Sequence, residues 1–237
     1  MSIRAPGSPT CSPASPITRP AASASCCPET GSQRVPSCRP PDQALSPCGP
    51  RRMLTVRSTA GAEVKLMVDF NQGLSLGDAL HRCRALDSLG LYWFEEPVAY
   101  DNLAGYARLA RGLHTPVQLG ENFYGPRAMH QALAMQAGDY VMPDLMRIGG
   151  VAGWLRAAAI AGGAGIEMSS HLYPEFSAHL LRVTETAHGL NGRIGRSRSC
   201  SQPFKVADGM IEVPDRPGAG IEWNEDAVER HRQAPYR

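Results

Sequence analysis

The chain has 237 residues, enough for one large domain or two small ones, and its formal net charge is only +2. The near balance of 24 basic and 22 acidic side chains argues against a nucleic-acid-binding protein, which would carry a strongly basic surface. The sequence contains no run of about 18 or more apolar residues, so we predict no membrane-spanning helix.

Residues 1–53 differ in composition from the rest of the chain. The first 50 residues hold 11 of the 20 prolines and 5 of the 7 cysteines, but no aromatic residue and a single leucine, Leu45. Such a segment cannot build a hydrophobic core, so we predict that residues 1–53 are disordered. A misread start or a frame change in the gene is an alternative explanation. The seven cysteines lack C-x-x-C spacing, which favours reduced thiols and a cytoplasmic location.

From residue 54 onward, short apolar runs alternate with amphipathic segments. The apolar runs predict buried strands at residues 64–70, 91–94, 116–119, 140–142 and 165–168, and a sixth near residues 182–187. The amphipathic segments predict helices, and the first of them starts at Ser75 with Asp78 as its capping partner. Regular alternation of strands and helices indicates an α/β protein with a parallel sheet covered by helices.

A polar residue follows or ends each of the first five predicted strands. These residues are Asp69, Glu95, Glu121, Asp144 and His171. Their spacing is close to the roughly 30 residues of one βα unit in a TIM barrel, where the carboxyl ends of the strands form the active-site rim. We therefore predict that residues 54–190 form an incomplete TIM (β/α) barrel of about six βα units, without the first two barrel strands.

The chain changes character again after the predicted barrel. Residues 191–203 form an atypical segment rich in arginine and serine, for which a frame change is again an alternative. Residues 204–237 predict a hairpin and a tail, because Asp208 and Gly209 are typical of a tight turn between two strands.

Three of the rim carboxylates favour a metal site. Asp69, Glu95 and Glu121 would converge from successive strands, and three like charges need a compensating cation. Oxygen ligands favour a hard ion such as Mg²⁺. Asn71 would lie beside these ligands and could orient them. The alternative is that each acid caps a helix or is solvated.

The other two rim residues suggest a general base. Asp144 and His171 would end adjacent strands, so that the carboxylate could hold the imidazole in one tautomer and raise its basicity. The alternative is a structural role for His171. We interpret the remaining histidines as structural or solvated: His81, His114, His130, His179, His188 and His231.

Several short blocks of sequence carry a resemblance to a known family. They are VDFNQ (68–72), WFEEP (93–97), GEN (120–122), MPDLMRIGGVAGW (142–154), MSSHLYPE (168–175) and VPDRPGAGIEW (213–223). Together they resemble the barrel domain of the enolase superfamily, and specifically of its mandelate racemase group, which includes muconate lactonizing enzymes.

The resemblance implies a magnesium enzyme. Asp69, Glu95 and Glu121 would bind Mg²⁺, and His171 with Asp144 would be the base. Enzymes of this group remove the proton next to the carboxylate of a 2-hydroxy or sugar acid through a metal-stabilised enediolate, which gives racemisation or dehydration.

The resemblance also identifies departures from the family pattern. No counterpart of the family's N-terminal α+β capping domain is found, and its Lys-x-Lys motif would fall near residues 38–40, which read Cys-Arg-Pro. Asn191 stands where the mandelate racemase group has a glutamate, and Arg147 where related sequences often have a lysine.

These departures leave three functional hypotheses open. The first is an enzyme with a small carboxylate substrate and a possible homo-oligomeric state. The second is a catalytically inactive fragment that retains at most divalent-metal binding. The third is a half-barrel that binds a partner.

Overall fold

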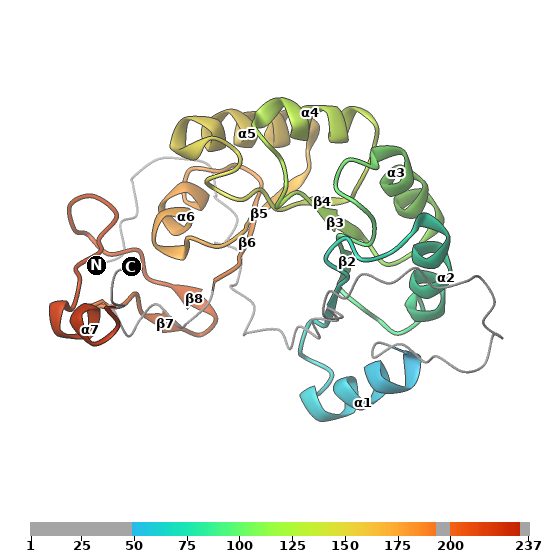
Figure 1. Ribbon diagram of the computed structural model, residues 1–237, viewed down its shortest axis with the longest axis horizontal. Coiled ribbons are helices and arrows are strands. Elements are labelled where there is room, and N and C mark those ends of the chain that lie inside the picture. Colours follow the sequence, from blue (N-terminus) through green and yellow to red (C-terminus); the bar gives the residue numbers. More distant parts are fainter. Residues whose placement is uncertain (1–48, 193–199, 233–237) are drawn as a thin grey trace, which may run out of the picture.

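The computed structural model describes residues 49–192 and 200–232. Six strands form one curved sheet in which each strand pairs in parallel with the next along the chain (Figure 1). They are β1 (Met67–Asp69), β2 (Trp93–Glu95), β3 (Val117–Leu119), β4 (Tyr140–Val141), β5 (Glu167–Ser170) and β6 (Ala187–Leu190). The prediction of an incomplete α/β barrel with about six βα units is confirmed.

Helices line the outer side of the curved sheet, as Figure 1 shows. Between the strands lie α2 (Leu76–Leu86), α3 (Leu103–Gly112), α4 (Pro126–Ala134), α5 (Gly150–Ala164) and α6 (Pro174–Leu181), and α1 (Pro50–Ala60) precedes the first strand. The C-terminal part consists of β7 (Val206–Ala207), β8 (Met210–Ile211) and α7 (Glu225–Arg230). None of the described helices is long and apolar enough to cross a membrane.

Two predicted local signals appear in the structure. The Ser75 hydroxyl accepts a hydrogen bond from the Asp78 backbone N–H at 3.1 Å, so Ser75 caps the start of α2. Asp208 and Gly209 have φ angles of 51° and 74° and join β7 to β8 in an antiparallel hairpin.

The core lies between the sheet and the outer helices. Val68 and Phe94, in the middle of β1 and β2, are fully buried in one apolar cluster, and Val141 and Met168 are fully buried in another. Because side chains alternate between the two faces of a strand, the residues next to Val68 and Phe94 face the inner side of the curve. Asp69 and Glu95 occupy such positions at the strand ends.

The structure corrects the predicted position of the sixth strand. Residues 182–186 form the turn after α6, in which the Thr184 backbone N–H donates to Leu181 O and the Thr184 hydroxyl donates to Leu180 O. These bonds hold the backbone of the turn to the end of the helix. The strand therefore starts only at Ala187.

The predicted boundary between disorder and fold also shifts. Helix α1 begins at Pro50, inside the segment 1–53 that was expected to be disordered, because Met53 is buried in the same cluster as Leu66. The other predictions for the N-terminus, including the departure at residues 38–40, lie outside the described residues, as does most of the arginine-rich segment (193–199).

Candidate active site

The structure brings the five predicted rim residues to the same end of the sheet. Asp69 and Glu95 are the last residues of β1 and β2 and lie opposite each other in the strand register. Glu121 follows β3 by two residues, and Asp144 and His171 form a parallel bridge just beyond β4 and β5. Parallel pairing without register slips up to β5 explains why residues about one βα unit apart meet at one rim.

Asp144 and His171 form a hydrogen-bonded pair. The distance between Asp144 Oδ2 and His171 Nδ1 is 2.9 Å, and Asp144 is only 4% exposed. The other carboxylate oxygen, Oδ1, accepts from the backbone N–H groups of Met146 at 2.9 Å and Arg147 at 3.1 Å. Asp144 is thus fixed by its own loop, and in turn it fixes the ring of His171.

Glu121 connects this pair to the rest of the rim. Its Oε2 lies 3.2 Å from His171 Nε2, so both ring nitrogens of the histidine face carboxylates. Its Oε1 accepts from Arg147 Nη1 at 3.2 Å, and the same guanidinium donates to the Glu121 carbonyl at 3.1 Å. Glu121, Asp144, Arg147 and His171 therefore form one continuous network.

Burial and neighbouring negative charge both disfavour the charged forms of Asp69 and Glu95. Burial raises the pKa of Glu95 to about 8, and the nearby charge of Asp69 adds to the shift. Burial also raises the pKa of Asp69, although the Asn71 backbone N–H donates to Asp69 Oδ1 at 2.7 Å and opposes the shift. In both cases the charged form is disfavoured without a neighbouring cation.

The chemistry of this donor set fits a hard divalent cation. Carboxylates from three adjacent strands supply oxygen ligands, and a positive ion would relieve the burial and repulsion that raise the two pKa values. As the side chains stand, the described residues contain no group of three or more His, Cys, Asp or Glu side chains arranged to hold a metal ion. Metal binding would have to draw these side chains closer together.

The three additional residues named from the sequence have different surroundings. The Asn71 side chain hydrogen-bonds to Asp69, and Arg147 contacts Glu121 as described above. The Asn191 side-chain amide instead lies 3.8 Å from Met142 Sδ. The structure thus brings Asn71 and Arg147, but not Asn191, into contact with the predicted ligands.

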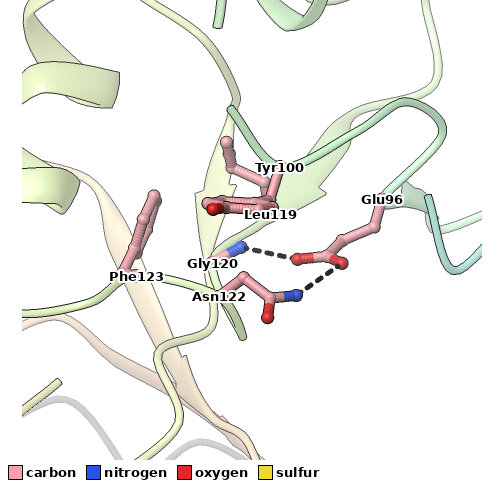
Figure 2. Close-up of a pocket in the computed structure, with 6 residues that line it drawn as sticks. All are labelled: Glu96, Tyr100, Leu119, Gly120, Asn122 and Phe123. Atoms are coloured by element: carbon pink, nitrogen blue, oxygen red, sulfur yellow. Dashed lines mark hydrogen bonds between the residues drawn. The ribbon is translucent and has the colours of Figure 1, made fainter. Parts of the chain in front are cut away.

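One buried carboxylate at the rim, that of Glu96, was missed in the sequence analysis. Glu96 is 2% exposed, and its two oxygens accept from Gly120 N at 3.5 Å and Asn122 Nδ2 at 3.3 Å (Figure 2). Burial raises its pKa to about 7, with a further contribution from the charge of Glu121. The available signal was the doubled glutamate between apolar neighbours in WFEEP, of which only the first glutamate was assigned a role.

Comparison with known proteins identifies the family. The family described as Enolase C-terminal domain-like matches residues 49–227. An enolase from alpha pretobacterium bal199, solved with bound Mg, is 55% identical with a TM-score of 0.74; the match covers 76% of this chain and 49% of that one. An enolase from Bradyrhizobium, complexed with magnesium and mandelic acid, is 41% identical with a TM-score of 0.71, and the match covers 76% and 50%.

A relative of known activity also matches this chain over most of its length. The L-talarate/galactarate dehydratase of Salmonella typhimurium is 30% identical over 177 residues, which are 75% of this chain and 44% of the relative. The chain spans about half the length of the relatives it matches. It belongs to the enolase superfamily, in the Enolase C-terminal domain-like family.

Proposed function

We propose that the chain supplies the metal-binding and base-bearing part of a magnesium-dependent enzyme that removes the proton next to the carboxylate of a 2-hydroxy or sugar acid. The observation that carries the proposal is the 2.9 Å contact between His171 Nδ1 and Asp144 Oδ2, placed beside Glu121 at the rim. A paired base next to a cluster of carboxylates combines proton abstraction with a site for a cation.

In this proposal Asp69, Glu95 and Glu121 hold Mg²⁺. The bound ion would supply positive charge for the negative charge that develops on the substrate carboxylate as the proton leaves. Solved relatives that contain magnesium support the choice of ion. Asn71 and Arg147, which contact Asp69 and Glu121, would orient the carboxylates.

His171 is the proposed base that accepts the proton. Asp144 would keep the proton of the neutral ring on Nδ1, so that Nε2 carries the lone pair that receives the substrate proton. Nε2 faces Glu121 Oε2 at 3.2 Å, and this carboxylate would turn from the ring toward the metal when the ion binds. The backbone N–H groups of Met146 and Arg147 hold Asp144 for this role. A single base permits dehydration or proton exchange more readily than inversion, which usually needs a second base on the opposite face.

Acid sugars are the proposed substrate class. The relatives include the L-talarate/galactarate dehydratase of Salmonella typhimurium and the arabinonate dehydratase of Saccharolobus solfataricus, and both names denote loss of water from a sugar acid. Asn191 could contact such a substrate if it turned from Met142 toward the rim. A cytoplasmic location and a homo-oligomeric state stay predictions from the sequence.

Solvent deuterium exchange tests the proposal. With Mg²⁺ present, the chain should exchange the hydrogen next to the carboxylate of galactarate or mandelate, as followed by NMR. His171→Asn should slow this exchange by about 100-fold or more, since general bases contribute at least that much. His130→Asn, a change on the exposed face of α4, is the matched control and should exchange at the normal rate. Equal exchange rates in wild type and His171→Asn would contradict the proposal.

The open sheet favours an alternative. In the described residues β1 and β6 each pair with a single strand, so they are the two edge strands of the sheet. Two alternatives would explain such edges. One is a half-barrel that binds a partner, and the other is an inactive fragment that keeps only metal binding. Absence of exchange together with metal binding that depends on Glu95 would favour the inactive fragment.

A further inference from the structure

The carboxylate of Glu96 lies where three loops of the rim meet. Each loop follows one of the strands β1 to β3. Asp69 and Glu95 end the first two strands, and Glu121 lies within the third loop. Glu96 is 2% exposed, and it belongs to the loop after β2. A buried carboxylate is unfavourable unless hydrogen bonds compensate it, so its partners indicate what it does.

The first set of partners belongs to the loop after β3. Glu96 Oε1 accepts from Gly120 N at 3.5 Å, and Glu96 Oε2 accepts from Asn122 Nδ2 at 3.3 Å. These two residues flank Glu121 in the sequence. Figure 2 shows both contacts converging on the Glu96 side chain.

The amide of Asn122 extends this link to a proposed ligand. Its Nδ2 lies 3.3 Å from Glu96 Oε2 and 3.2 Å from Glu121 Oε1. An amide nitrogen carries two hydrogens, so it can donate to both carboxylates at once. The position of the Glu121 carboxylate is thus tied to Glu96 through a single side chain.

The second set of partners belongs to the loop after β1. The Gln72 side chain hydrogen-bonds to the Glu96 carboxylate, and the Gln72 backbone N–H donates to the Glu96 carbonyl at 2.7 Å. Gln72 Oε1 accepts in turn from the Tyr100 backbone N–H at 3.0 Å, which returns to the loop after β2. Gln72 lies three residues after Asp69.

The backbone conformation of these loops also depends on the contacts around Glu96. Gln72 and Glu96 have φ angles of 61° and 38°, in the left-handed region that residues other than glycine seldom occupy. Such conformations persist only where surrounding contacts hold them, and the bonds around Glu96 are contacts of this kind.

We infer that Glu96 is a positioning residue, which sets the distances among Asp69, Glu95 and Glu121 by joining the loops that follow strands β1, β2 and β3. The inference rests on the proposed function, because it assigns Glu96 a role toward the metal that these three residues would hold. Glu96 accepts hydrogen bonds from the loops and does not itself bind the ion.

Titration with Mn²⁺ tests this role without any need for activity. Mn²⁺ accepts the same oxygen ligands as Mg²⁺, and EPR distinguishes its free and bound forms. Glu96→Gln keeps the shape of the side chain but turns an amide donor toward loop groups that are themselves donors. We expect it to weaken Mn²⁺ binding by about 10- to 100-fold, the usual effect of losing a partner that orients metal ligands.

Two further variants make the result specific. Glu63→Gln, at an exposed carboxylate before β1, is the matched control and should bind Mn²⁺ within about twofold of wild type. Asn122→Ala removes the link to Glu121 and should weaken binding like Glu96→Gln, and the double variant should lose less than the two losses combined. The spectrum of bound Mn²⁺ should change in both variants, whereas a merely structural role would change only the thermal midpoint.

The possible failures are distinguishable. If Glu96→Gln binds Mn²⁺ like wild type while Glu95→Gln does not bind it, the metal site stands and the role of Glu96 is refuted. If wild type shows no Mn²⁺ binding that depends on Glu95, the proposed function fails, and the inference fails with it. If Glu96→Gln unfolds, Asn122→Ala decides the question by the same criteria.

Discussion

Two histidines of the inner face, His171 and His188, lie in different chemical surroundings. His171 sits at the rim between two carboxylates, whereas His188 lies within β6 with only 11% of its side chain exposed. Its Nδ1 is 3.1 Å from Ser169 Oγ, its Nε2 contacts the Tyr92 hydroxyl, and its ring stacks on Tyr140 at 4.9 Å. His188 was assigned no partner from the sequence, because Tyr140 and Ser169 lie on β4 and β5 and Tyr92 lies just before β2.

The surroundings of His188 predict a loss of stability in acid. Burial lowers its pKa below the ordinary value of 6.5, an effect that Glu167 opposes and Lys65 reinforces. The unfolded chain therefore binds the proton more readily, and the free energy of unfolding falls as the pH drops through about 6.5. His188→Gln should lose less stability than wild type between about pH 7.5 and 5.5 in urea unfolding, while His130→Gln should follow wild type. Parallel pH profiles for wild type and His188→Gln would contradict this.

At the scale of elements, helix α5 depends on a close approach at its first turn. A Cβ atom added to Gly153 would lie 1.9 Å from the carbonyl oxygen of Ile148, in the loop that runs from Asp144 to the helix. Only glycine allows the helix to pack this closely against that loop. The same loop holds the carboxylate of Asp144 through its backbone N–H groups, so the packing of α5 also supports the proposed base.

Alanine substitutions in α5 should therefore have opposite effects. Gly153→Ala should destabilise the protein by about 1–3 kcal/mol, because the methyl group meets backbone and the loop must move. Gly163→Ala, in the same helix with no atom within 4 Å of the added Cβ, should stabilise it by about 0.5–1 kcal/mol through helix propensity. Urea unfolding measures both changes, and a stabilising Gly153→Ala would show that the loop yields without strain.

The order of strands and helices was predictable wherever neighbouring residues in the sequence determine the structure. Alternation of apolar runs and amphipathic segments marked the first five strands, and Ser75 marked the start of α2, since a capping bond joins residues three apart. The sixth strand was predicted too early in the chain, because residues 182–186 form the turn after α6, in which the Val183 backbone N–H donates to Leu180 O. The bonds that hold this turn join residues only three or four positions apart, so the error was an unrecognised turn.

At the scale of the whole molecule, the fold is a curved sheet with helices on its outer side (Figure 1). The proposed site lies at the end of the sheet where the strands terminate. No single element contains the site, because Asp69, Glu95 and Glu121 come from three different βα units. A ligand held by all three would connect these units and would bind only the folded chain. Metal binding should then be coupled to folding.

Magnesium should accordingly raise the stability of the whole chain. At a concentration about 100 times the dissociation constant, a ligand that binds only the folded state adds about 2.7 kcal/mol to the free energy of unfolding. Urea unfolding with increasing Mg²⁺ should show this gain for wild type, and Glu121→Gln should lose most of it. An equal gain in Glu121→Gln would indicate nonspecific ion binding.

The sequence by itself determined the type of fold and the residues that reach the rim. The period of the βα units and the polar residue at each strand end are local patterns, and parallel pairing sends strand ends to one side. Only the tertiary structure decided which rim groups touch. The network of Glu96 with Gln72 and Asn122 joins residues 24 to 26 positions apart and depends on loop conformation, which the sequence pattern does not encode. Burial likewise raised the pKa of Glu95, since a pKa reflects the folded surroundings of a group.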